Sequence, residues 1–185
     1  RVGMNGAAVH EAGPGQVAVV TGSGGIGLVS RRALKSRGVS KVSVVDVLAN
    51  RLAKAKERGA DEVIDGSKED GVAMVRKYTD GAGCDVVIET AGSEQSVAQA
   101  VQYTKKGACI VIVGYSRAGT MTIPTTLAAD KELTFKTVTA TATSTPSPSS
   151  RCRQGWRTSR TSSRKSTAWT TSRPGLTRAS RTRQN

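Results

Sequence analysis

The chain has 185 residues, enough for one domain with a tail, and a formal net charge of +14 that would suit a nucleic-acid or anionic-membrane partner. No apolar run approaches the roughly 20 residues that span a bilayer, the first residues lack the apolar core of a signal peptide, and the three cysteines form neither a disulfide framework nor a metal-binding pair. We therefore expect a cytoplasmic protein with reduced thiols and no membrane partner.

The positive charge is concentrated at the C-terminus. Ten of the 28 Lys and Arg residues, and no Asp or Glu, lie in residues 139–185, which leaves 18 basic and 14 acidic groups in residues 1–138. Twenty-one of the last 47 residues are Ser or Thr, without apolar periodicity. Such a segment cannot bury enough surface to offset its ordering entropy. We predict that 139–185 is a disordered basic tail.

Apolar runs alternate with helix-compatible stretches over the first 138 residues. The predicted elements are, in chain order, strand 17–21, helix 26–37, strand 41–46, helix 49–58, strand 62–64, helix 69–78, strand 85–88, helix 94–104 and strand 108–113, followed by two last ordered segments, 120–123 and 133–138. Alternating strands and helices predict βαβ units with a parallel sheet covered on both faces. Right-handed crossovers then favour an α/β fold with a doubly wound parallel sheet.

A glycine-rich turn, GSGGIG, joins the first predicted strand to the first predicted helix. In a dinucleotide-binding G-x-G-x-x-G turn, Gly22 permits the tight bend, Gly24 lets the backbone approach a pyrophosphate, and Gly27 lets the helix pack on the strand. The pyrophosphate would lie at the helix N-terminus. The predicted cofactor-binding residues of this turn are Gly22, Ser23, Gly24, Gly25, Ile26 and Gly27.

An acidic residue ends the next predicted strand. Asp46 lies 19 residues after Gly27, and its carboxylate can accept both hydroxyls of the adenosine ribose but would repel a 2′-phosphate. NAD is therefore favoured over NADP. Arg51 tempers this preference, because an Arg nearby can serve a phosphate. We include Val47 with Asp46 and Arg51 among the predicted cofactor-binding residues.

Two other nucleotide-binding folds fit this sequence less well. A P-loop needs Gly-Lys-Ser/Thr, whereas Leu28 and Val29 follow Gly27. Short-chain dehydrogenases would place glycines at 22, 26 and 28, where positions 26 and 28 are Ile and Leu, and Tyr103 lacks the Lys four residues later. A glycine turn without cofactor is the remaining alternative.

Four segments together resemble the cofactor domain of medium-chain, zinc-dependent dehydrogenases, namely VAVVTGSGGIGLV, VSVVDVLANRLAKAKERGADEVID, GAGCDVVIETAGSEQSVAQAV and KKGACIVIVGYS. Through DVLANRLAKAKE and KELTFKTV the chain is most similar to the sorbitol, xylitol and L-iditol branch. VGMNGAAVHEAGPGQ resembles the helix and turn that lead into that domain. The resemblance implies a remnant of the catalytic-domain connection over 1–15 and a Rossmann domain over 16–138.

The family resemblance also implies residue roles. Residues 22–27 would hold pyrophosphate, and Asp46 with Arg51 would hold the adenosine ribose. The other implied cofactor-binding residues are Thr90, Ala91 and Gly92 along the cleft, and Val113, Gly114 and Tyr115 near the nicotinamide. In the intact enzyme, hydride would pass from a polyol or secondary alcohol to NAD with the help of zinc. A threonine- or butanediol-type dehydrogenase of the same superfamily is the alternative.

The zinc ligands of that family belong to an N-terminal domain without counterpart here. His10 is the only histidine, and no Cys or Glu lies at a useful spacing from it. We therefore predict no catalytic and no metal-binding residue, and expect the chain alone to be inactive. NAD(H) is its expected partner. The family tends to form tetramers through late strands of this domain, which are expected to be disrupted here.

A single reading-frame slip accounts for the tail. In a reading frame shifted by one base, residues 140–150 can become R-Y-R-H-I-Y-P-I-A-I-E and residues 158–165 can become N-L-K-D-I-V-T-E. Both stretches resemble the sequence that follows this segment in members of the family. We predict that 139–185 is a frameshift product, which leaves the sheet incomplete at its C-terminal end. The alternative from another class is a basic nucleic-acid-binding arm in which Trp156 and Trp169 stack on bases. No specific nucleic acid is expected.

Overall fold

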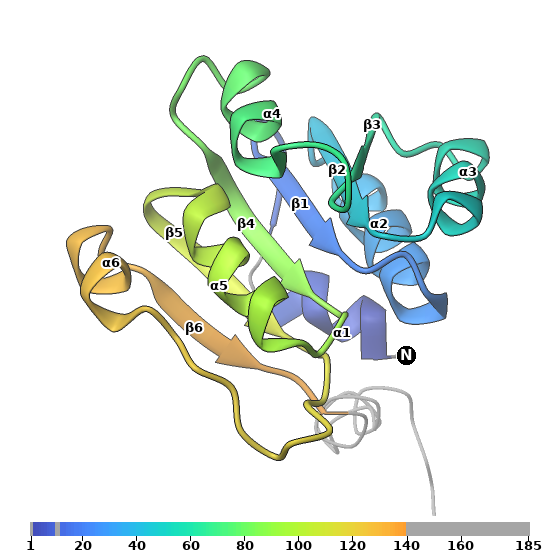
Figure 1. The fold of residues 1–185 in the computed structure, drawn as a ribbon. Coiled ribbons are helices and arrows are strands. Elements are labelled where there is room, and N and C mark those ends of the chain that lie inside the picture. Colours follow the sequence, from blue (N-terminus) through green and yellow to red (C-terminus); the bar gives the residue numbers. More distant parts are fainter. Residues whose placement is uncertain (1, 10–11, 140–185) are drawn as a thin grey trace, which may run out of the picture. The chain divides into compact units, whose positions relative to one another are not determined.

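The computed structural model describes residues 2–9 and 12–139. Six strands form one sheet in which every neighbouring pair is parallel, in the order β3-β2-β1-β4-β5-β6 (Figure 1). This strand order is that of the doubly wound dinucleotide-binding fold. The predicted α/β fold with a parallel sheet is confirmed.

The elements follow the predicted alternation closely. The strands are β1 (Val17–Thr21), β2 (Lys41–Asp46), β3 (Glu62–Asp65), β4 (Cys84–Glu89), β5 (Thr104–Ile112) and β6 (Thr134–Thr137). The helices are α1 (Val2–Val9), α2 (Gly25–Ser36), α3 (Ala49–Glu57), α4 (Gly71–Lys77), α5 (Glu94–Tyr103) and α6 (Thr125–Asp130). None of the helices in the described ranges is long and apolar enough to cross a membrane.

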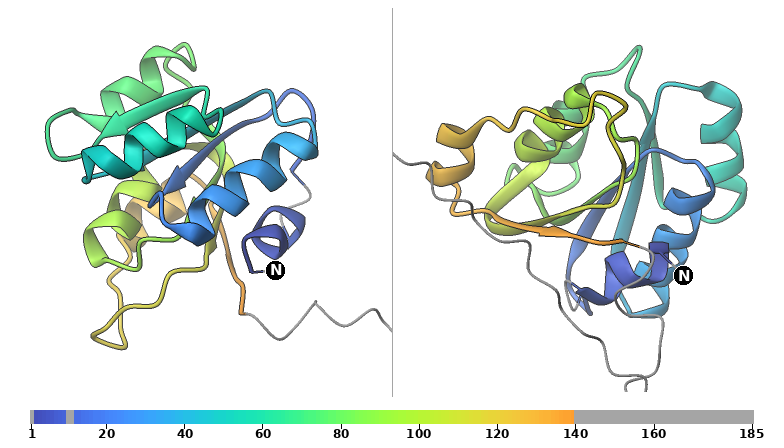
Figure 2. Two further views of the ribbon diagram at one scale, coloured as in Figure 1. Left: turned by 90° about the vertical axis from the view of Figure 1, so that its right-hand side faces the viewer. Right: turned by 90° about the horizontal axis from the view of Figure 1, so that it is seen from below.

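Successive side chains of a strand point to opposite faces of the sheet, and the buried side chains therefore form two clusters, one on each face. On β1, Val20 joins a cluster with Leu34 of α2, and Val19 joins the other with Val101 of α5. The first cluster also includes α1 and α3, and the second includes α4 and α6 (Figure 2). Helices on both faces explain why the strands are nearly continuous Val and Ile.

The helix N-termini are stabilised differently. Asp70 caps α4 by accepting from the backbone N–H groups of Val72 and Ala73. Ser93 and Ser96 form a reciprocal capping box at the start of α5. No side chain caps α2, which begins after Gly24. The first-turn N–H groups of α2 therefore depend on water or a ligand.

Three stretches of the described chain differ from the sequence prediction. Helix α6 was missed because it has six residues, less than two turns, and no side-chain cap. Strand β5 begins at Thr104, earlier than predicted, because the register with β4 shifts between Cys84 and Val86 and admits a polar start to the strand. Residues 120–123 are irregular. The predicted tail, and with it the incompleteness of the sheet after β6, lies outside the described residues.

The Lys131 side chain caps the C-terminal end of α5. Its Nζ donates to the carbonyl oxygens of Val101 at 2.8 Å, Thr104 at 2.7 Å and Gln102 at 3.2 Å. Burial lowers the pKa of Lys131. Partly buried hydrogen bonds from a charged donor stabilise a fold more than neutral ones do.

We predict that Lys131→Met lowers the free energy of unfolding by about 2 kcal/mol, because three carbonyl groups lose a charged donor. Urea denaturation measures the loss, with Lys106→Met as the control because Lys106 is exposed. Equal stability of the two variants would contradict this account.

Candidate functional site

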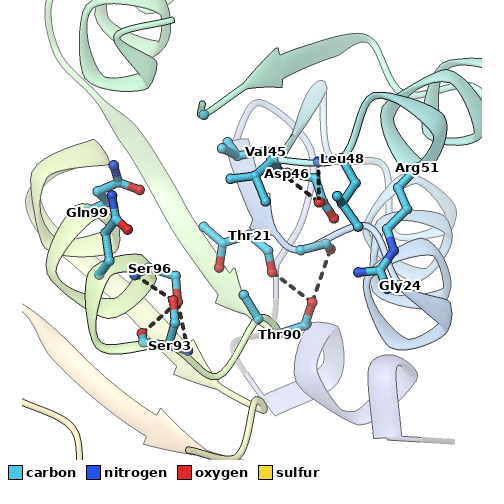
Figure 3. A pocket seen from close by; sticks show the side chains of 15 residues that line it. Thr21, Gly24, Val45, Asp46, Leu48, Arg51, Thr90, Ser93, Ser96 and Gln99 are labelled. Atoms are coloured by element: carbon cyan, nitrogen blue, oxygen red, sulfur yellow. Dashed lines mark hydrogen bonds between the residues drawn. The ribbon is translucent and has the colours of Figure 1, made fainter. Parts of the chain in front are cut away.

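A first cavity lies where the strand order reverses, at the carboxyl ends of β1, β2 and β4 (Figure 3). Its volume is about 270 Å³. Seven of the predicted site residues line it: Gly22, Gly24, Asp46, Val47, Arg51, Thr90 and Ala91. The other lining residues were not predicted: Thr21, Val45, Leu48, Gly66, Ser93, Gln95, Ser96 and Gln99. In open α/β sheets this position is where ligands bind.

The second cavity, of about 370 Å³, lies beyond the ends of β5 and β6. Three predicted residues line it: Val113, Gly114 and Tyr115. Gly92 lies between the two groups and has φ +71; a Cβ there would be 2.5 Å from the carbonyl oxygen of Tyr115. The predicted site therefore comprises two cavities whose bordering loops meet at Gly92.

Two positions of the glycine turn require glycine: Gly22 for its left-handed backbone conformation and Gly27 for lack of space. Gly22 has φ +89, and its N–H donates to the carbonyl of Val45 at 2.7 Å. A Cβ on Gly27 would be 1.9 Å from the carbonyl oxygen of Gly22, so only glycine fits. A Cβ on Gly24 would meet nothing within 4 Å. Since packing does not require glycine at position 24, the open space there is available to a ligand.

The N-terminus of α2 is suited to an anion. Gly25, Ile26 and Gly27 form its first turn, and no side chain accepts from their backbone N–H groups as a cap. The helix dipole adds partial positive charge at this end. Arg51 of α3 lines the same cavity as Gly24 and is drawn with its guanidinium reaching over the cleft (Figure 3).

Asp46 is held by four hydrogen bonds. Its Oδ2 accepts from the N–H and the hydroxyl of Ser23, both at 2.7 Å, and its Oδ1 accepts from the N–H groups of Val47 at 2.8 Å and Leu48 at 3.0 Å. Burial raises the pKa of Asp46, but these hydrogen bonds outweigh that effect, so its pKa lies below its ordinary value. Asp46 is thus a fixed carboxylate at the edge of the first cavity.

Glu89 is the most prominent residue that the sequence prediction missed. It ends β4, is fully buried, and its Oε1 accepts from the N–H groups of Ala91 at 2.8 Å and Gly92 at 2.9 Å and from the hydroxyls of Ser96 at 2.7 Å and Thr21 at 3.4 Å. Oε2 has no hydrogen-bond partner among the described residues. An acid at the end of the apolar run DVVIE was the signal available in the sequence.

Comparison with known proteins identifies the family. The zinc-binding dehydrogenase family matches residues 25–157, a range that begins within the glycine turn at Gly25 and includes α2 and strands β2 to β6. The chain belongs to the zinc-binding dehydrogenase family.

Relatives within this zinc-binding dehydrogenase family share the described domain. The chain is 43% identical over 113 residues to the uncharacterized zinc-type alcohol dehydrogenase-like protein YdjJ of Escherichia coli, covering 61% of this chain and 33% of YdjJ. It is 39% identical over 126 residues to human sorbitol dehydrogenase, covering 67% of this chain and 35% of that enzyme. The chain spans about a third of the length of these relatives.

A solved structure agrees with this assignment to the zinc-binding dehydrogenases. An Escherichia coli oxidoreductase/dehydrogenase of unknown specificity involved in membrane biogenesis is 40% identical and superimposes with a TM-score of 0.70. The match covers 74% of this chain and 39% of the other.

The described part of this chain has no zinc ligand set. No group of three or more His, Cys, Asp or Glu residues in it could hold a metal ion. His10 lies outside the described residues. Cys84 and Cys109 are free and buried, and burial raises the pKa of both thiols, which makes them unreactive. The described residues therefore do not fit the metal.

We predict that Gly27→Ala destabilises the fold by about 1–3 kcal/mol or more, because the added Cβ overlaps the Gly22 carbonyl. Gly25→Ala is the matched control, since a Cβ there meets nothing within 4 Å and alanine favours the helix. Thermal unfolding of both variants measures the difference. Equal melting temperatures would contradict the packing argument.

We further predict a pH-dependent contribution from Asp46. Its folded pKa lies below the unfolded value of about 3.9, so the stabilisation is fully present above that value and is lost as pH falls through the folded pKa. Between about pH 5 and pH 3, the free energy of unfolding of Asp46→Asn should therefore fall less steeply than that of the wild type. The control Asp130→Asn, at an exposed position, should keep the wild-type slope. A wild-type slope in Asp46→Asn would disprove this role.

Proposed function

We propose that this chain is the NAD(H)-binding part of a dehydrogenase that takes hydride from a polyol or secondary alcohol. The observation that carries this proposal is the first cavity, where the uncapped N-terminus of α2 and the open face of Gly24 lie beside the fixed carboxylate of Asp46. A dinucleotide needs both features, one for its pyrophosphate and one for its adenosine ribose. Family membership supports the same cofactor.

The adenosine half would occupy the first cavity. The pyrophosphate would lie over Gly24 and accept from the first-turn N–H groups of α2, with Arg51 adding positive charge. Ribose hydroxyls would donate to Asp46. Since that carboxylate already accepts four hydrogen bonds, they would replace the Ser23 hydroxyl, the only one of the four donors that is a side chain. A 2′-phosphate would meet the negative charge, which disfavours NADPH.

The nicotinamide half would reach the second cavity. It is lined by the predicted residues Val113, Gly114 and Tyr115. Because Gly92 contacts Tyr115, the loops that border the two cavities lie next to each other. An extended dinucleotide could therefore lie across both cavities. Binding and orienting the cofactor is the part of the reaction that these residues would perform.

The alcohol substrate is proposed by analogy with relatives. Similarity to human sorbitol dehydrogenase supports a polyol, and the sequence KELTFKTV supports the same branch. Because the chain spans about a third of these relatives, the zinc and the substrate pocket would belong to parts of the protein not represented here. A threonine or butanediol substrate would place the protein in another branch of the superfamily.

We propose that residues 1–15 are a remnant of the connection to a catalytic domain, 16–138 the cofactor domain and 139–185 a frameshifted tail. The family match extends to residue 157, which lies inside the proposed tail and outside the described residues. Sequencing the coding DNA tests the proposal. A neighbouring frame after Val138 that continues with R-Y-R-H supports it, and a frame without such a continuation refutes it.

We predict that Gly24→Ala weakens NADH binding at least about ten-fold while leaving the melting temperature unchanged. The added Cβ enters open space in the apo fold but occupies the approach to the pyrophosphate. NADH fluorescence titration measures binding, with NADPH expected to bind more weakly than NADH. A wild-type chain without any NADH response at millimolar concentration would refute the proposed function.

A further inference from the structure

Glu89 connects the borders of the two cavities. Its backbone carbonyl accepts from the N–H groups of Val113 at 2.8 Å and Gly114 at 3.0 Å, and its side-chain Oε1 accepts from Ala91 and Gly92. One residue thereby holds the loop after β4 and the loop after β5 together. This residue is fully buried, at the carboxyl end of a central strand.

The second carboxylate oxygen of Glu89 lies beside Gly114, a residue that lines the second cavity. A Cβ on Gly114 would be 2.7 Å from Glu89 Oε2, and Gly114 lines that cavity. Oε2 has no hydrogen-bond partner, and within the described chain no Lys or Arg forms a salt bridge with Glu89. All four hydrogen bonds of the side chain are accepted by Oε1.

Holding the loops does not require a negative charge. A glutamine side-chain oxygen could accept from the same N–H and hydroxyl groups that Oε1 accepts from. A buried carboxylate with an unpartnered oxygen is costly to the fold. A charge on Glu89 would therefore call for a role besides packing.

We propose that Glu89 is a positioning residue whose charge makes the second cavity favour the oxidised nicotinamide ring over the reduced one. The inference rests on the proposed function, because it requires NAD(H) to lie across the two cavities. The oxidised ring carries one positive charge and the reduced ring none. A carboxylate behind Gly114 attracts the first and leaves the second unaffected. A unit charge acting over roughly 10 Å at an effective dielectric constant of about 20 changes a binding constant about ten-fold.

The test compares three ligands on the full 185-residue chain. NAD⁺, NADH and ADP-ribose, which lacks the nicotinamide, are titrated against wild type, Glu89→Gln and Glu57→Gln. Glu57 is the matched control, because it makes the same chemical change at an exposed position at the end of α3. In Glu89→Gln, Kd for NAD⁺ should rise about five- to ten-fold, whereas Kd for NADH and ADP-ribose should change less than about two-fold. Glu57→Gln should leave all three values unchanged.

Other results decide against the proposal in distinguishable ways. If Glu89→Gln raised Kd equally for all three ligands, Glu89 would act only by holding the loops. Unchanged binding of all three would show that the charge has no role. A wild-type chain that binds none of them would overturn the proposed function and this inference with it.

A second variant covers the case in which Glu89→Gln does not fold, as judged by circular dichroism. Glu89→Asp keeps the charge and shortens the side chain. If the ratio of Kd for NADH to Kd for NAD⁺ stays at the wild-type value in Glu89→Asp, the charge account is supported even where absolute affinity falls. A change of this Kd ratio from the wild-type value in Glu89→Asp, despite the retained charge, would overturn the charge account.

Discussion

The close approach of α2 to the turn after β1 is the contact on which the site depends. The Gly22 carbonyl and the Gly27 Cα come so near that a single added methyl group would overlap at 1.9 Å. This contact places the start of α2 directly above the end of β1, where the strand order reverses. The start of α2 and the exposed face of Gly24 are thereby placed beside Asp46, which the pairing of β1 with β2 brings to the same edge of the sheet.

Two carboxylates flank this arrangement, and their surroundings differ. Both oxygens of Asp46 are fully hydrogen-bonded, and the residue borders solvent at the cavity edge. Glu89 is buried; its Oε1 accepts several hydrogen bonds, whereas its Oε2 has no donor among residues 2–9 and 12–139. In the roles that we propose, environment more than residue type distinguishes the two acids: the first contacts a ligand, and the second acts through its charge without contact.

Local patterns account for what could be predicted from the sequence. Strands β1 and β2 were predicted to the residue because Val-rich runs end at clear signals, the glycine turn and Asp46. Asp46 was found through its spacing from the glycines. Glu89 was not, because its contact with Thr21 joins residues 68 positions apart, and only the pairing of β1 with β4 brings them together. Helix α6 carried too few residues for a periodic signal.

The most direct test of the central claim, that the cleft above α2 binds NAD(H), is a titration of NADH into the ¹⁵N-labelled chain followed by amide chemical shifts. The account predicts saturable shifts at amides around the first cavity, those of Ser23, Gly24, Gly25, Val47 and Ala91. Absence of shifts at these positions at millimolar NADH, or shifts confined to residues 139–185, would contradict it.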